Sequence, residues 1–325
     1  MGTVSWPEGI DARPIDKGDV HMWAELLAAK EKVDQEGENY DADDLLEELE
    51  DAHLDAAHDT VGLWAGGVMV GYGKLHAPTS VVDVDRLRTE GTVHPEWRRR
   101  GLGTTLMRWM IGRAGELHAE KYSFVAGEVN TSSISTNIGA DRLLRNLGFE
   151  ECRYFFDMKR PLGTAVPDVP VADGFRLAPF APRLDEDLRV THNEAFRDHW
   201  GSTPRDEESW KTWVTGARAF RPGLSYVVLD GETIAAYVLG YEWVADTEVT
   251  GVRELYIGQV GTRRAYRGRG LARAALAKVL AEGVQAGYQR AGLGVDADNP
   301  TGALGLYESL GFAVHSKWIT YRLPL

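Results

Sequence analysis

Apolar residues recur along the chain with two different periods, and the period changes many times between residues 10 and 322. Alternation with polar residues is typical of half-buried strands, whereas recurrence at every third or fourth position is typical of amphipathic helices. In the first half, the pattern predicts strands at 10–15, 60–65, 67–76, 82–93, 122–128 and 149–159, and helices at 19–33, 42–54, 101–118 and 135–146.

The second half repeats this order of elements. Gly66-Gly67 in the first half and Asp230-Gly231 in the second are typical two-residue hairpin turns. The alternation of strands and helices in each half predicts an α/β (α+β) fold built on a mixed sheet. The predicted elements of the second half are strands at 175–178, 224–229, 233–241, 252–262, 291–296 and 312–322, and helices at 185–196, 206–217, 270–286 and 301–310.

Composition divides the chain into two parts. Residues 161–174 are rich in proline and glycine and poor in apolar side chains, which is typical of a linker. We therefore expect a first domain at 1–160, a linker at 161–174 and a second domain at 175–325. A length of 325 residues suits two domains of ordinary size.

Charge and cysteine content limit the possible partners. The net charge of −13 argues against nucleic-acid binding, which needs a basic face, but suits a cationic acceptor such as a protonated amine. The single Cys152 excludes an internal disulfide and a multi-cysteine metal site. No run approaches a membrane span, and residues 1–20 lack a signal-peptide pattern. We expect a cytoplasmic protein without metal or membrane partner, and the sequence leaves monomer and homodimer open.

The strongest chemical signal lies between residues 255 and 280. An apolar strand leads into a turn rich in arginine and glycine, and a helix with a buried stripe follows at once. The first N–H groups of a helix lack partners and its dipole is positive there, so this turn suits a diphosphate. The turn lacks the Lys-Ser or Lys-Thr of a Walker loop, and Arg273 replaces the third glycine of a dinucleotide fingerprint. What remains is R-x-x-G-x-A at Arg267, Gly270 and Ala272.

An earlier stretch repeats this turn. Residues 92–107 place Arg98, Gly101 and Gly103 in the same positions between a predicted strand and a predicted helix. A second marker, Leu-Gly-Phe at the end of a helix, occurs at 147–149 and again at 310–312, at nearly the same separation as the two turns. A single long period of this kind indicates a duplicated domain rather than a solenoid.

These motifs resemble those of the GNAT superfamily of N-acetyltransferases, whose coenzyme A pyrophosphate loop has this pattern. The resemblance covers nearly all of both halves and implies two tandem GNAT-like acyl-CoA N-acyltransferase domains, with acetyl-CoA (coenzyme A) as co-substrate. The residues implied to contact it are Val260, Gly261, Thr262, Arg267, Gly268, Arg269, Gly270, Leu271, Ala272 and Asn299 in the second half, and Thr92, Val93, Arg98, Arg99, Arg100, Gly101, Leu102 and Gly103 in the first.

The resemblance also implies a catalytic acid in the second half. Asn299 follows the fifth predicted strand and Tyr307 lies on the next helix, as in the family pattern. A phenol there can protonate the departing coenzyme A thiolate, because its unperturbed pKa of about 10 lies close above that of a thiol. A core aromatic residue on an amphipathic helix is the alternative interpretation of Tyr307.

A general base is expected as well, because the acceptor amine must lose a proton. Family bases often lie on the strand before the loop, at a position that Tyr256 occupies here. Glu254 is two residues earlier on the same strand face and is the best candidate, with Glu242 on the neighbouring strand behind it. A solvent-facing charge at the strand edge is an equally weighted interpretation of Glu254.

The first half departs from the family pattern. Leu144 precedes Phe149 by five residues, as Tyr307 precedes Phe312, so the acid is absent. Asn130 is the expected match to Asn299. We therefore expect a degenerate first half that keeps the fold and binds acetyl-CoA, and a catalytic second half. Tandem members with one degenerate half include the mycothiol synthase type, whose C-terminal domain is similar to the string around Asn299 and Tyr307.

The implied function is transfer of an acetyl group to the primary amine of a small molecule, of the amino-sugar, mycothiol-precursor or antibiotic type. The alternative is a non-catalytic sensor or scaffold that binds acetyl-CoA. Amine-dependent release of free thiol from acetyl-CoA distinguishes the two.

Overall fold

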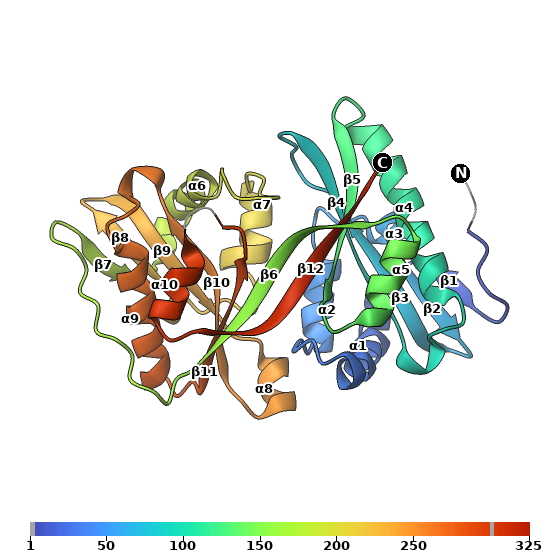
Figure 1. Cartoon of the computed structure of the whole chain (residues 1–325), viewed down its shortest axis with the longest axis horizontal. Helices are drawn as coiled ribbons and strands as arrows, with labels where there is room; N and C mark the ends of the chain where they lie inside the picture. Colours follow the sequence, from blue (N-terminus) through green and yellow to red (C-terminus); the bar gives the residue numbers. More distant parts are fainter. Residues whose placement is uncertain (1–3, 300–301) are drawn as a thin grey trace. The chain divides into compact units, whose positions relative to one another are not determined.

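The computed structural model describes residues 4–299 and 302–325. The chain forms two compact units; in Figure 1 the first is blue to green except for the red strand β12 at the C-terminus. The first comprises the chain up to Arg153 together with Trp318–Leu325, and the second comprises Tyr154–Lys317. None of the described helices combines the length and the apolar character that crossing a bilayer requires.

The first unit is a sheet with helices on both faces (Figure 1). Its strands follow the order β1-β2-β3-β4-β5-β12, and only β4 and β5 run parallel to each other among these neighbours. The strands are β1 (Asp11–Arg13), β2 (Thr60–Ala65), β3 (Val68–His76), β4 (Val84–Val93), β5 (Ala126–Ile134) and β12 (Ala313–Pro324), and the helices are α1 (Val20–Asp34), α2 (Ala42–Leu49), α3 (Ala56–Asp59), α4 (Leu102–Lys121) and α5 (Ile138–Asn146).

Two apolar clusters hold this sheet between its helices. On one face, Leu87 of β4 packs among side chains that include Leu106 and Met110 of α4. On the other face, Trp23 of α1 lies over Tyr72 of β3, with 5.0 Å between the ring centroids. Burying one such apolar side chain contributes about 1.5–3 kcal/mol, so the amphipathic pattern fixes which face each helix presents to the sheet.

The second unit repeats the arrangement. Its strands follow the order β7-β8-β9-β10-β11-β6, and β10 runs parallel to β11. The strands are β6 (Glu150–Pro161), β7 (Arg176–Pro179), β8 (Tyr226–Asp230), β9 (Thr233–Tyr241), β10 (Glu254–Thr262) and β11 (Arg290–Asp296), and the helices are α6 (Asp185–Ala195), α7 (Glu207–Trp210), α8 (Val244–Thr250), α9 (Leu271–Gln285) and α10 (Ala303–Ser309).

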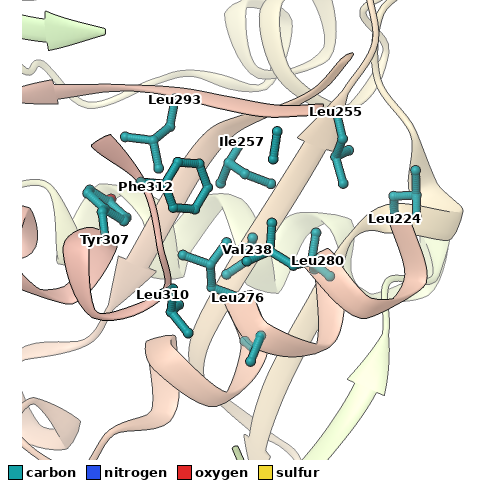
Figure 2. Close-up of a cluster of buried hydrophobic side chains, with 14 of the residues drawn as sticks. Leu224, Val238, Leu255, Ile257, Leu276, Leu280, Leu293, Tyr307, Leu310 and Phe312 are labelled. Carbon is teal, nitrogen blue, oxygen red and sulfur yellow. The ribbon is translucent and has the colours of Figure 1, made fainter. Parts of the chain in front are cut away.

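The main core of the second unit lies between α9 and the sheet. Leu276 and Leu280 of α9 face Val238 of β9 and Leu255 of β10, as Figure 2 shows. Tyr307 of α10 lies at one end of this cluster beside Phe312. A second cluster on the opposite sheet face contains Trp210, Tyr237 and Leu239.

The final strand of each unit comes from the other half of the sequence. Residues Phe155–Pro161 of β6 pair with β11, whereas Trp318–Pro324 of β12 pair with β5. The predicted domains at 1–160 and 175–325 kept each closing strand with its own half, whereas the compact units divide the chain after Arg153 and again after Lys317. Periodicity shows that a strand exists, but it cannot show which sheet edge the strand joins.

Several other elements differ locally from the predicted ones. The strand predicted at 122–128 begins at Ala126, and the helix predicted at 206–217 is α7 followed by a π-helical turn at Lys211–Thr215. Short α8 had no prediction. The first residue of the helix predicted at 301–310 lies outside the described residues. In the predicted linker, Val166, Val169, Val171 and Ala172 pack against the core of the second unit.

Candidate active site

The two arginine–glycine turns have the same backbone conformation. In the second unit, Arg267 is extended (φ −62°), and Gly268 and Gly270 have φ of 77° and 74°. In the first unit, the matching φ values are −66° for Arg98, 64° for Arg99 and 85° for Gly101. Each glycine at the end of the turn precedes a helix, α9 or α4. The turns are therefore repeats in three dimensions as well as in sequence.

Both turns are open on their outer side. A Cβ atom added at Gly101, Gly268 or Gly270 would meet no atom within 4 Å. Leu102 and Leu271, the first residues of the two helices, point inward and are buried. The free space beside these glycines lets a diphosphate approach the backbone closely at the start of each helix.

Arg98 and Arg267 hold the turns in place. The Nε of Arg267 donates to the carbonyl oxygen of Thr262 at 3.3 Å, and its Nη2 donates to that of Ala195, the last residue of α6, at 2.9 Å. The Nε of Arg98 donates to the carbonyl oxygen of Val93 at 3.1 Å, and its two Nη atoms bind Asp34, the last residue of α1, at 2.7 Å. These predicted ligand residues thus tie the end of a strand to the end of a helix.

The remaining arginines of the turns point outward. Arg99, Arg100 and Arg269 are exposed. The guanidinium of Arg100 lies over the ring of Trp97, and that of Arg269 lies 5.7 Å from the ring centroid of Tyr266. Gly103 and Ala272 are half-buried in the first turns of α4 and α9. Charge near the open N–H groups therefore comes from the exposed arginines.

The strands before the turns separate from their parallel neighbours. β10 pairs with β11 only over Glu254–Tyr256, and β4 pairs with β5 only over Val84–Arg88. Beyond these points lie Val260, Gly261 and Thr262 in the second unit, and Thr92 and Val93 in the first. They keep their antiparallel partners in β9 and β3. An opening between parallel strands therefore ends at each turn.

Tyrosine rings occupy the space over glycines of the separated strands. A Cβ at Gly261 would lie 2.4 Å from the ring of Tyr237, and one at Gly258 would lie 2.6 Å from that of Tyr241. Gly258 also forms the β-bulge of β10, where the register with β9 shifts. The hydroxyl of buried Tyr237 lies 2.7 Å from Nδ1 of His192. Burial lowers the pKa of His192 to about 3, so this imidazole is neutral and structural.

Tyr307 is buried in the core of the second unit. It is 7% exposed and packs against Phe312 with ring centroids 6.2 Å apart. Burial raises the pKa of its phenol to about 12, so the hydroxyl keeps its proton at neutral pH. Asn299 lies in the turn before α10, where its N–H donates to the carbonyl oxygen of Asp296 at 3.1 Å.

Glu254 is the first residue of β10 and lies opposite Arg290, two residues before Tyr256, the last residue of β10 that pairs with β11. Its carboxylate accepts a hydrogen bond from Lys159 of β6 at 2.8 Å and also pairs with Arg290 of β11. The Glu254 carboxylate fits only because residue 292 is a glycine, since a Cβ at Gly292 would lie 2.4 Å from Oε1 of Glu254. Sequence reasoning missed Lys159 and Arg290, since their approach depends on strand pairing across the sheet.

Glu242 has a different environment. Although burial opposes its ionisation, hydrogen bonds from Arg253, Tyr288 and Arg221 lower the pKa of its carboxyl to about 2. A group with that pKa does not accept a proton near neutrality. Glu242 therefore anchors the segments around β9 and β10.

The first unit differs at the positions of both candidate catalytic groups. Arg86 pairs across the sheet with Glu128, as Glu254 pairs with Arg290, so the charges are reversed. Leu144 takes the place of Tyr307, because the N–H of Phe149 donates to the carbonyl oxygen of Leu144 as that of Phe312 does to Tyr307.

The expected match of Asn130 to Asn299 is wrong. Asn130 lies within β5, opposite Arg88 and Arg322. Asn137 occupies the turn instead, and its N–H donates to the carbonyl oxygen of Ile134 at 3.0 Å, as that of Asn299 does to Asp296. The strand was predicted to end at residue 128, but β5 continues to Ile134, so the counterpart of Asn299 lies later in the sequence than expected.

Each unit contains two parallel strands that separate, a turn rich in arginine and glycine and a following helix, an arrangement typical of acyltransferases that use acyl-CoA. The profile of the acetyltransferase (GNAT) family matches residues 21–149 and 186–312. The chain belongs to this family. It is an acyltransferase, and GNAT acetyltransferases use acetyl-CoA as co-substrate.

Curated relatives match across both units. A mycothiol acetyltransferase of Salinispora tropica is 31% identical over 283 residues, covering 85% of this chain and 84% of the relative. A mycothiol acetyltransferase of Mycobacterium sp. (strain JLS) is 32% identical over 270 residues, covering 78% and 79%.

Solved structures share the fold. A GCN5-related N-acetyltransferase from Sphaerobacter thermophilus has a TM-score of 0.77 and 26% identity, covering 98% of this chain and 97% of that one. A tandem GNAT protein from the clavulanic acid biosynthesis pathway has a TM-score of 0.71 and 16% identity, covering 97% and 98%. The tandem GNAT architecture predicted from the two turns is confirmed.

Proposed function

We propose that this protein transfers the acetyl group of acetyl-CoA to the primary amine of a mycothiol precursor, and that its second unit performs the chemistry. The single observation that supports the assignment to the second unit is the contrast at matching positions. Glu254 and Tyr307 stand where the first unit has Arg86 and Leu144. The acceptor class rests on the likeness to mycothiol acetyltransferases over most of both chains.

The open turn at Gly268 and Gly270 would receive the diphosphate, with Arg269 supplying nearby positive charge. Backbone groups of Val260, Gly261 and Thr262 would hold the pantetheine arm in the opening between β10 and β11. An N–H of this segment would stabilise the oxyanion that forms when the amine adds to the thioester carbonyl.

Glu254 is the proposed general base. The amine would lose its proton to this carboxylate, directly or through a water molecule, as the new N–C bond forms. Lys159 and Arg290 fix the carboxylate at the first residue of β10. Because both cations compete with the amine for the same oxygens, we expect one ion pair to loosen when the acceptor binds.

Tyr307 is the proposed acid. As the C–S bond breaks, its phenol would donate a proton to the departing sulfur. With a pKa of about 12, the phenol stays protonated before the reaction. An unperturbed thiol has a pKa of about 8.5. Burial that raises the pKa of the phenol also raises the pKa of a thiol in the same site, so the difference between the two pKa values becomes smaller.

The first unit is proposed to bind acetyl-CoA without turning it over. Its turn has the same φ values and the same open outer side at Gly101. Its opening lacks both candidate catalytic groups. The alternative function is supported by the same first unit, which keeps the turn but lacks the candidate catalytic groups. If the second unit also lacked activity, the protein would bind acetyl-CoA only as a sensor or scaffold.

An acceptor panel tests the proposal. The release of coenzyme A from acetyl-CoA, as distinct from total free thiol, would be measured with a cysteinyl glucosaminyl inositol, free glucosamine, an aminoglycoside and no amine. The acetylated product would be identified by mass. We expect amine-dependent release that is fastest with the cysteinyl compound. Tight acetyl-CoA binding without release for every amine would favour the sensor, and faster release with an aminoglycoside would overturn the acceptor class.

A further inference from the structure

A buried guanidinium lies against the end of the helix that bears Tyr307. Arg160 of β6 is 2% exposed. Its Nε donates to the carbonyl oxygen of Leu310, directly after α10, at 2.6 Å, and its Nη2 donates to that of Ala165 at 2.9 Å. A Cβ at Gly311 would lie 3.1 Å from Nε, so the side chain rests directly on the helix end.

In the part of the chain that the structure describes, this cation has no compensating anion. Within residues 4–299 and 302–325, no carboxylate pairs with Arg160, and its Nη1 has no hydrogen-bond partner. Removing a charge from water without a counterion is expensive, and a buried donor without a partner adds to the cost. A position that serves only packing would be filled more stably by an apolar side chain.

The first unit shows that an apolar side chain suffices there. Arg160 lies opposite Ala291 of β11, and Leu323 lies opposite Val129 of β5. Both precede a proline. After those prolines, the N–H of Leu162 donates to the carbonyl oxygen of Gln289, and that of Leu325 donates to the carbonyl oxygen of Gly127, each at 2.9 Å. Gln289 and Gly127 each lie two residues before the strand residue that faces Arg160 or Leu323. The register thus makes Leu323 the counterpart of Arg160.

The contacts agree with this register. A Cβ at Gly148, the counterpart of Gly311, would lie 3.5 Å from Leu323, where that at Gly311 meets Arg160. The first unit has Leu323 at this position and Leu144 on its helix, whereas the second unit has Arg160 and Tyr307. The charged residue therefore accompanies the candidate acid, although the fold forms with leucine.

We propose that Arg160 is a positioning residue for the acetyl transfer. It holds the carbonyl at the end of α10 and thereby fixes where the Tyr307 hydroxyl meets the leaving sulfur. The carbonyl of Tyr307 already accepts from Leu310 at 3.0 Å and from Phe312 at 3.1 Å. The hydrogen bond from Arg160 to the carbonyl oxygen of Leu310 therefore restrains the same short turn, residues 307–312. This proposal rests on Tyr307 being the acid of the proposed function.

The test compares Arg160→Leu, which copies the first unit, with Arg160→Lys and with Leu323→Met as the matched control in the first unit. In Arg160→Leu, we expect kcat to fall on the order of ten- to a hundredfold, because small misplacements of catalytic groups cost this much. The dissociation constant for acetyl-CoA should stay unchanged, Arg160→Lys should recover part of the loss, and Leu323→Met should leave kcat unchanged.

Two readouts separate positioning from simple loss of stability. Amide hydrogen exchange at 307–312 should accelerate in Arg160→Leu, with exchange at 144–149 unchanged. In a Tyr307→Phe background, Arg160→Leu should change kcat less than about twofold, since coupled residues are non-additive. Equal losses in both backgrounds, or unchanged exchange at 307–312, would overturn the proposal. If Tyr307→Phe itself retains full activity, the assigned acid fails, and the exchange data still decide whether Arg160 restrains α10.

Discussion

The substitution Gly270→Ala tests the diphosphate turn with little disturbance elsewhere. Gly270 has φ of 74°, and a Cβ there would meet no atom within 4 Å. The added methyl group therefore costs only the backbone strain of a left-handed alanine, about 1 kcal/mol. For a unit of this size, that loss lowers Tm by about 2–4 °C. A diphosphate seated on the helical N–H groups, in contrast, would meet the methyl group directly.

The binding effect can be separated from the strain by a matched glycine. Gly251, at the end of α8, has φ of 70° and the same free space, but lies outside the turn. Gly251→Ala should lower Tm as much as Gly270→Ala and leave acetyl-CoA binding unchanged. Gly270→Ala should weaken binding at least about tenfold, which corresponds to about 1.4 kcal/mol.

Isothermal titration with acetyl-CoA is the assay. The wild-type protein should bind two equivalents, one at each turn. Gly270→Ala should remove the site of the second unit, and Gly101→Ala, with φ of 85°, should remove that of the first. If Gly270→Ala keeps wild-type stoichiometry and affinity while losing the same stability as Gly251→Ala, the turn is not the diphosphate site.

Two further predictions concern carboxylates. Glu254→Gln should lower kcat and abolish the acidic limb of its pH profile, and a limb that persists would assign the base elsewhere. Glu242 has a folded-state pKa of about 2 against an ordinary value of 4.5, so its stabilisation is present above pH 4.5 and is lost as pH falls toward 2. Glu242→Gln should therefore reduce the free energy of unfolding in urea at pH 7 and have little effect near pH 2. An equal loss at both pH values would contradict this pKa.

Much of the fold was predictable because the relevant signals are local. The order of strands and helices follows from apolar periodicity, and the two turns follow from arginine and glycine at fixed distances from a strand and a helix. Leu144 could be matched to Tyr307 because both lie in a helix that ends in Leu-Gly-Phe. These features depend on residues close together in the chain.

The features that sequence did not predict depend on long-range pairing. The exchange of β6 and β12 places Lys159 beside Glu254 and Arg160 beside Leu310, although the partners lie far apart in sequence. The hydrogen bond from Arg267 to the carbonyl oxygen of Ala195, at the end of α6, likewise joins residues far apart in the sequence. A motif gives the kind of residue and its spacing, whereas the direction of its side chain depends on what packs beside it.

The central claim is that the second unit transfers acetyl groups with Tyr307 as the acid. The most direct test is kcat of Tyr307→Phe for amine-dependent thiol release, measured beside Leu144→Met in the first unit. We predict a loss of at least about tenfold for Tyr307→Phe with an unchanged dissociation constant for acetyl-CoA, since only one proton donor is removed, and unchanged kcat for Leu144→Met. Wild-type kcat in Tyr307→Phe would contradict the claim.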